Sequence, residues 1–233
     1  MLKITLLLVL KSCQRFWCDK LDDIGTPCFL SIANINIGMN RLEKRFFDFV
    51  VSFIGLCLIW WIILIAWIIA SVETKSNGFF IQKRVGKNGV LFNLYKIKTM
   101  KKVDGVDSMI TSSNDIRITK GGKFFRDTKI DELPQFWNVL LGDMSFVGPR
   151  PDIEGYADKL QGDDRIILSI RPGITGPASI KYKNEEDILS QQNNPKEYND
   201  AEIWPDKVKI NIEYIKNWSL RTDIEYIIKT ITG

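Results

Sequence analysis

The longest uninterrupted apolar segment of the chain runs from Phe49 to Val72. Its 24 residues include no charged side chain. A helix needs about 20 apolar residues to cross the hydrocarbon core of a bilayer, and a run of 18 or more is typical of a membrane helix. The pattern therefore predicts a membrane-inserted helix and disfavours the alternative of a buried helix in a soluble domain.

Basic residues flank this segment at both ends. They are Arg41, Lys44 and Arg45 before it and Lys75, Lys83, Arg84 and Lys87 after it. Because basic flanks favour the cytoplasmic side, both ends are predicted to lie there. A re-entrant helix that bends near Gly55 or at Trp60-Trp61 satisfies this prediction. The segment contains no proline, so a straight spanning helix stays open.

The region ahead of the apolar segment has no clear periodicity. Its own apolar run, Ile4 to Leu10, is shorter than the core of a signal peptide and lacks a cleavage site of small residues. We hypothesise that Met39 is the natural start, which a native peptide from residues 20–35 would disprove. The predicted organisation is an unassigned extension (1–38), a membrane helix with a basic flank (39–75) and a cytosolic domain (76–233).

Two alternating segments follow the membrane helix, Phe79–Val85 and Val90–Lys98, on either side of Lys87-Asn88-Gly89. Asn-Gly between such segments predicts a β-hairpin. The stretch from Phe79 to Val103 carries seven Lys or Arg residues and no acid. This basic hairpin is either a solvated face near anionic lipid headgroups or a phosphate-binding wall, and the two can coexist.

The rest of the chain predicts loops and short helices. A polar loop is expected over 104–114, and two helices near Asp206–Asn217 and Thr222–Thr230. An apolar stripe at helical spacing on the last helix is typical of a core face, with the membrane surface as the alternative. This stripe comprises Ile224, Ile227, Ile228 and Ile231. The predicted fold class is α+β and mainly helical.

Composition narrows the chemistry. A net charge of +4 argues against a nucleic-acid-binding protein, and the absence of histidine removes the commonest general base and metal ligand. A general acid, general base or nucleophile must therefore be Asp, Glu, Lys, Tyr, Ser or Cys. The four cysteines form no CxxC pair, which disfavours a zinc site or a disulfide framework and favours a reduced, cytosol-facing domain.

An acid pair, Asp131 and Glu132, opens the stretch "IDELPQFWNVLLGDMSFVGPRP". Pro134 is tolerated in the first turn of a helix, and Gly142 is a typical residue just past a helix end. The pair is therefore expected at a helix N-terminus, where the dipole would keep Asp131 ionised as a nucleophile must be. Simple helix capping is the alternative. Two adjacent carboxylates can also share a Mg²⁺ ion with substrate phosphate oxygens.

Three arginines come near this pair in the sequence. Arg117 and Arg126 precede it, and Arg150 lies between two prolines after it. The planar guanidinium binds phosphate through two donors at once. Together with a membrane helix, these residues predict phosphoryl transfer between a soluble phosphorylated substrate and a lipid.

Several ordered motifs resemble the bacterial sugar transferase family, the monotopic phosphoglycosyl transferases that act on polyprenyl phosphate. They are "RVGKNGVLFNLYKIKTM", "NDIRITKGGKFFR", "IDELPQFWNVLLGDMSFVGPRP" and "RPGITG". The resemblance implies a UDP-sugar donor, an undecaprenyl phosphate acceptor and release of UMP. It also implies a place on the cytoplasmic face of the bacterial inner membrane and a product that starts an O-antigen, capsule, exopolysaccharide or glycoprotein glycan.

By the same resemblance, Asp131 is the nucleophile that forms a phosphosugar-aspartyl intermediate, and Glu132 is its partner at the Mg²⁺ site. Lys96, Arg126 and Arg150 match the family's motif lysine and its phosphate- and nucleotide-contacting arginines. The chain departs from the family where Trp60-Trp61 replaces a Ser-Pro pair and where Ser179 stands near a usual glutamine. The alternatives are a lipid-pyrophosphate hydrolase and a non-catalytic membrane anchor or scaffold of a glycan-assembly complex. A homodimer is left open.

Overall fold

The computed structural model describes residues 32–102 and 115–233. The predicted loop at 104–114 and most of the extension at 1–38 lie outside the described residues. The chain divides into two units, Met1–Met39 and Asn40–Gly233. The described part of the first unit is the opening turns of one helix.

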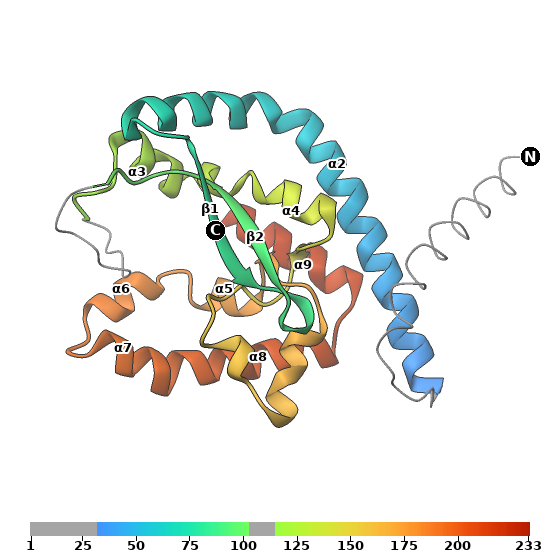
Figure 1. Ribbon diagram of the computed structural model, residues 1–233. Helices are drawn as coiled ribbons and strands as arrows, with labels where there is room; N and C mark the ends of the chain where they lie inside the picture. The colour runs from blue at the N-terminus through green and yellow to red at the C-terminus, as the bar shows by residue number, and fades with distance from the viewer. Residues whose placement is uncertain (1–31, 103–114) are drawn as a thin grey trace, which may run out of the picture. The chain divides into compact units, whose positions relative to one another are not determined.

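The described chain is mainly helical, with one long apolar helix followed by a β-hairpin and short helices, as predicted (Figure 1). In chain order the elements are α2 (Ile32–Thr74), β1 (Phe79–Val85), η1 (Lys87–Gly89), β2 (Leu91–Ile97), α3 (Lys120–Asp127), η2 (Ile130–Glu132), α4 (Gln135–Leu141), β3 (Ser145–Val147), η3 (Ala157–Lys159), η4 (Gly162–Ser169), β4 (Gly173–Thr175), α5 (Pro177–Lys181), α6 (Glu185–Ser190), α7 (Pro195–Tyr198), η5 (Asn199–Ile203), α8 (Trp204–Lys216) and α9 (Leu220–Thr232).

Helix α2 contains the predicted membrane segment. Its stretch Leu42–Thr74 is long and apolar enough to cross a membrane, and most of it is not buried by the rest of the protein. A bend was expected near Gly55 or Trp60-Trp61, but the helix continues without interruption through both positions. It curves instead, as an arc whose inner side faces α3 and α4 (Figure 1). Gly55 lies on that inner side, where an added Cβ would come within 2.6 Å of the Phe136 ring.

Polar contacts fix the first half of α2 to the folded domain. Arg45 donates through Nη1 to the carbonyl oxygen of Val139 at 2.6 Å and through Nη2 to that of Leu140 at 2.7 Å. These carbonyls belong to the last turn of α4, where intrahelical donors run out and a cation is favourable. Buried Asp48 accepts hydrogen bonds from the Ser145 hydroxyl and the Phe146 N–H, both at 3.1 Å.

The second half of α2 is fixed as well. The carboxylate of Glu73 accepts the backbone N–H of Gly121 at 3.1 Å, at the start of α3. A Cβ on Gly121 would approach that carboxylate to 2.8 Å, so glycine is needed for the close contact. Both halves of α2 therefore contact the same domain.

The β-hairpin forms as predicted. β1 and β2 pair antiparallel, with Lys83 opposite Asn93 and Val85 opposite Leu91. The connecting turn η1 places Asn88 in the left-handed region at φ 59°, a conformation that asparagine tolerates better than most residues. A second sheet was not predicted: β3 and β4 pair parallel, with Ser145 opposite Gly173 and Val147 opposite Thr175.

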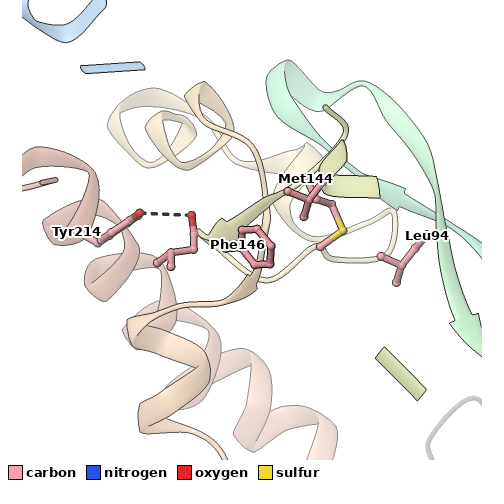
Figure 2. Close-up of a cluster of buried hydrophobic side chains, with 6 residues drawn as sticks. Leu94, Met144, Phe146 and Tyr214 are labelled. Carbon is pink, nitrogen blue, oxygen red and sulfur yellow. Dashed lines mark hydrogen bonds between the residues drawn. The ribbon is translucent and has the colours of Figure 1, made fainter. Parts of the chain in front are cut away.

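A cluster of buried hydrophobic side chains joins several of these elements (Figure 2). It contains Leu94 of β2, Met144 and Phe146 beside and within β3, and Tyr214 of α8. The Tyr214 hydroxyl donates to the carbonyl oxygen of Val147 at 3.3 Å (Figure 2). This shared packing holds the hairpin, β3 and α8 together.

The two C-terminal helices, α8 and α9, confirm the sequence prediction within a few residues. The isoleucine stripe on α9 does not form a core face. Ile227 packs against the core, but Ile224, Ile228 and Ile231 are 42%, 53% and 79% exposed. The isoleucines share one face of the helix as their spacing predicts. That face is largely exposed, because no described element covers it.

Candidate functional site

The acid pair lies in η2, a single 3₁₀ turn that precedes α4. The pair was expected at a helix N-terminus, and it lies in the turn that leads into α4, with Pro134 at the N-cap position and Gln135 as the first residue of the helix. The chain enters η2 through Lys129 in the left-handed region, at φ 58°. Gly142 ends α4 in the left-handed region as predicted, at φ 94°.

Glu132 is the anion around which two cations meet. Its Oε1 atom accepts from Lys96 Nζ at 2.8 Å and from Arg150 Nη2 at 3.1 Å. Lys96 comes from β2 and Arg150 from the loop after β3, so the contact unites three separate segments. Burial raises the pKa of Glu132, but Arg150 and Lys96 outweigh it and lower that pKa to about 2. The carboxylate is ionised at any physiological pH.

Asp131 is buried, and its environment is different. Its Oδ1 atom has no hydrogen-bond partner among the described residues. Burial raises the pKa of Asp131, and the charge of Glu132 adds to this effect, while Lys96, Lys129 and Arg126 oppose it. Burial thus opposes ionisation of Asp131, and the nearby cations favour it. An additional contribution from the helix terminus stays a prediction.

Arg126 lies on α3, close enough for its charge to lower the pKa of Asp131. Its Nε atom donates to the Thr99 hydroxyl at 2.9 Å, and its Nη2 atom contacts Met100 Sδ at 3.2 Å. Within the described ranges it has no carboxylate partner. Its charge is thus available to an anionic substrate.

Arg117 is placed differently from the other predicted cations. It forms a forked pair with Asp115, with Nη2 to Oδ2 at 2.6 Å and Nε to Oδ1 at 3.0 Å. The structure thus brings Lys96 and Arg150 onto Glu132, sets Arg126 nearby, and pairs Arg117 with a carboxylate of its own. A phosphate-binding role for Arg117 stays a prediction.

Asp152 was not predicted from the sequence, and Arg84 was predicted only as part of the basic flank and hairpin. Both extend the charged region beyond Arg150. A small hollow beside Arg150 is lined by Val85, Pro149, Asp152 and Ile167. Burial raises the pKa of Asp152 to about 7, against the opposing charges of Lys207, Arg84 and Arg150. The only signal for Asp152 was its place directly after the Pro-Arg-Pro sequence.

The acid pair fits a Mg²⁺ ion that the protein binds through few ligands. No group of three or more His, Cys, Asp or Glu side chains that could hold a metal occurs in the described part of the chain. An all-protein cage is therefore lacking there. Mg²⁺, however, binds commonly through one or two carboxylates and completes its shell with water and substrate phosphate. The unpartnered, buried Oδ1 atom of Asp131 beside ionised Glu132 suits that arrangement.

Comparison with known proteins supports the resemblance to the bacterial sugar transferase family. A family model described as bacterial sugar transferase matches residues 39–233. The chain is 38% identical over 213 residues to the UDP-glucose:undecaprenyl-phosphate glucose-1-phosphate transferase of Klebsiella pneumoniae, covering 88% of this chain and 42% of that protein. It is 37% identical to the galactosyl transferase CpsE of Streptococcus agalactiae serotype III (82% and 41% covered). With the uncharacterized sugar transferase EpsL of Bacillus subtilis it shares 35% identity (81% and 85% covered). The chain thus spans about two fifths of the length of the first two relatives.

Proposed function

Because the chain belongs to the bacterial sugar transferase family, we propose that it transfers a sugar-1-phosphate from a UDP-sugar to undecaprenyl phosphate. The Klebsiella relative is named for this type of transfer, from UDP-glucose to undecaprenyl phosphate. In this proposal the lipid-linked product initiates a polysaccharide or glycoconjugate. One observation carries the proposal: buried Asp131 lies beside Glu132, whose carboxylate is bonded to Lys96 and Arg150.

The proposed reaction has two displacements at one phosphorus atom. In the first, a carboxylate oxygen of Asp131 attacks the phosphorus that bears the sugar, and the bond from that phosphorus to the UMP oxygen breaks, so that UMP leaves with the bonding pair. In the second, a phosphate oxygen of undecaprenyl phosphate attacks the same phosphorus, and its bond to Asp131 breaks. Covalent catalysis of this kind divides one difficult step into two easier ones.

The surrounding side chains have distinct tasks in this proposal. Arg150 is half exposed, at 52%, so its guanidinium can bind a donor phosphate while it stays on Glu132. Lys96 keeps positive charge beside Asp131 and opposes the effect of burial on its pKa. Arg126, and further out Arg117, would bind phosphate oxygens. Asp131 and Glu132 would hold Mg²⁺, which when bound neutralises charge on the donor diphosphate.

The arrangement of α2 supports insertion from the cytoplasmic side. A helix of about 30 residues is roughly 45 Å long, enough to reach across a hydrocarbon core of about 30 Å. Yet Arg45 near one end and Glu73 near the other both contact the same domain. A straight spanning helix would separate these two residues by the bilayer, so we propose the re-entrant placement in a bacterial cytoplasmic membrane.

An assay of membrane fractions tests this function directly. Fractions that contain the protein are incubated with a panel of UDP-sugars, with and without undecaprenyl phosphate, and UMP is measured. The proposal expects sustained UMP release with one or a few sugars, and only when the lipid acceptor is present. Sustained release without acceptor would indicate a hydrolase, and no release with any sugar would indicate a scaffold.

A further inference from the structure

Asn138 is a fully buried polar residue that no proposed catalytic step uses. It lies on α4 with an exposed fraction of 0%. Its side-chain amide makes two hydrogen bonds to the backbone of β2. Nδ2 donates to the carbonyl oxygen of Asn93 at 2.7 Å, and Oδ1 accepts the N–H of Tyr95 at 3.1 Å.

These two bonds lie on the edge of β2 that has no strand partner. Among the described residues the hairpin sheet contains β1 and β2 alone, so the outward N–H and C=O groups of β2 need another partner. The amide of Asn138 supplies one donor and one acceptor, as a neighbouring strand residue would. Only asparagine and glutamine carry a carbonyl acceptor and an N–H donor on one side chain, as a peptide group does, and Asn138 is the shorter of the two, fully buried between α4 and β2.

The hydrogen bonds between Asn138 and β2 lie next to a residue of the candidate site. The residue after Tyr95 is Lys96, whose ammonium bonds Glu132. Lysine has a long side chain with about 2 kcal/mol of rotamer entropy, so a defined Lys96–Glu132 contact requires a well-placed strand backbone. Two elements meet here: the turn that carries Glu132 ends two residues before α4, and β2 carries Lys96.

Hydrophobic packing alone would allow the strand to slide. Leu94 packs in the same core as Val139 of α4, but apolar contacts are not directional. The paired hydrogen bonds of Asn138 define one register between β2 and α4. The Asn138 amide also contacts Asp143 Oδ2 at 3.3 Å, which fixes its orientation.

We propose that Asn138 is a positioning residue, which fixes β2 against α4 so that Lys96 is held on Glu132. This inference rests on the proposed transferase function, since it assigns Asn138 an effect on that reaction. Asn138 touches no reacting atom and acts through Lys96.

A double-mutant cycle on the full-length protein tests the proposal. Asn138→Asp keeps the size and the acceptor for Tyr95 but loses the donor to Asn93, and it is compared in the wild-type and Lys96→Met backgrounds. We expect kcat to fall about 10- to 100-fold in the wild-type background, the effect of one or two buried hydrogen bonds. In the Lys96→Met background the same substitution should lower kcat less than about 3-fold, because the residue it acts through is gone.

The control is a second buried asparagine. Asn211 lies on α8 with an exposed fraction of 6% and none of the bonds to β2. Asn211→Asp should lower the melting temperature, as Asn138→Asp does, but change kcat little in either background. Thermal unfolding of each variant separates stability from rate.

Two kinetic results would overturn the inference. One is an Asn138→Asp effect on kcat of equal size in both backgrounds, and the other is an effect of Asn211→Asp on kcat as large as that of Asn138→Asp. If Asn138→Asp does not fold, Asn138→Ala takes its place in the cycle, and failure of both to fold would assign Asn138 a structural role instead. If the wild type itself shows no acceptor-dependent turnover, the proposed function fails, which is a separate outcome.

Discussion

The ammonium of Lys96 lies 2.8 Å from the Oε1 atom of Glu132, although the two residues are 36 positions apart in the chain. The contact joins the β-hairpin to the turn that carries the acid pair. It neutralises one carboxylate of the pair and places positive charge beside the other, since Lys96 also lowers the pKa of Asp131 against the effect of burial. The site is thus built by tertiary packing around two adjacent acids.

Replacing Glu132 with glutamine should lower kcat about 100-fold, because the anion that holds both Lys96 and Arg150 is lost. Glutamine preserves the size and one acceptor, so the fold should survive. The measurement is acceptor-dependent UMP release together with a magnesium titration. Glu225→Gln, which removes an exposed partner of Arg221, is the matched control and should be as active as the wild type. Equal rates and equal magnesium dependence for Glu132→Gln would remove this residue from the site.

Replacing Arg45 with alanine should destabilise the domain by about 2 kcal/mol or more, because two carbonyls of the last turn of α4 lose a charged donor. For a chain of this size that corresponds to a drop of about 5 °C in melting temperature. Thermal unfolding of detergent-solubilised protein provides the measurement. Arg221→Ala, at a position where the side chain is 89% exposed, should leave the melting temperature unchanged. An Arg45 variant as stable as this control would show that α2 contributes no cap to α4.

Local patterns in the sequence predicted the elements that such patterns govern. The apolar segment, the Asn88-Gly89 turn and the glycine end of α4 each depend on residues close together in the chain, and each forms as predicted. The parallel pairing of β3 with β4 was missed because each strand has only three residues, too few to establish a period.

Four of the candidate residues lie together in the structure, but their environment could not be predicted. Motif matching selected Asp131, Glu132, Lys96 and Arg150, which the structure brings together. The raised pKa of Asp131 depends on burial by segments distant in sequence, which no local pattern reveals. For the same reason the exposure of Ile228 could not be predicted: helical spacing identifies an apolar face but not what covers it.

The stability of the protein should depend on pH through Asp152. Burial raises its pKa from 3.8 to about 7 in the folded state. Between about pH 4 and pH 7 the unfolded chain therefore releases this proton while the folded chain keeps it, so the free energy of unfolding falls as pH rises. Asp152→Asn removes this effect, and its melting temperature relative to the wild type should be higher at pH 8 than at pH 5.

Asp206→Asn is the control for the Asp152 prediction. Hydrogen bonds from Lys181 and Tyr182 lower the pKa of Asp206, so this carboxyl is ionised in both folded and unfolded chains across pH 5 to pH 8. Its replacement should change the melting temperature by a similar amount at both pH values. A pH-independent difference between Asp152→Asn and the wild type would contradict the assignment of the titration to Asp152.

The re-entrant placement of α2 predicts that both of its ends face the cytosol. In a variant with all four cysteines replaced by serine, a single cysteine is introduced in place of Asn40 or of Ser76. A membrane-impermeant maleimide should label both positions in inside-out vesicles and neither in intact spheroplasts. Labelling of Asn40→Cys from the outside, with Ser76→Cys labelled from the inside, would establish a spanning helix.

The central claim is that the carboxylate of Asp131 bonds to phosphorus during turnover. Purified protein is mixed with the UDP-sugar that supports acceptor-dependent turnover, without lipid acceptor, quenched early, and measured by intact mass and by peptide mapping. The account predicts an added mass equal to one sugar phosphate on the peptide that contains Asp131, one UMP released per modified chain, and neither product with Asp131→Asn. An unmodified wild-type protein that nevertheless turns over with acceptor, or full activity in Asp131→Asn, would contradict it.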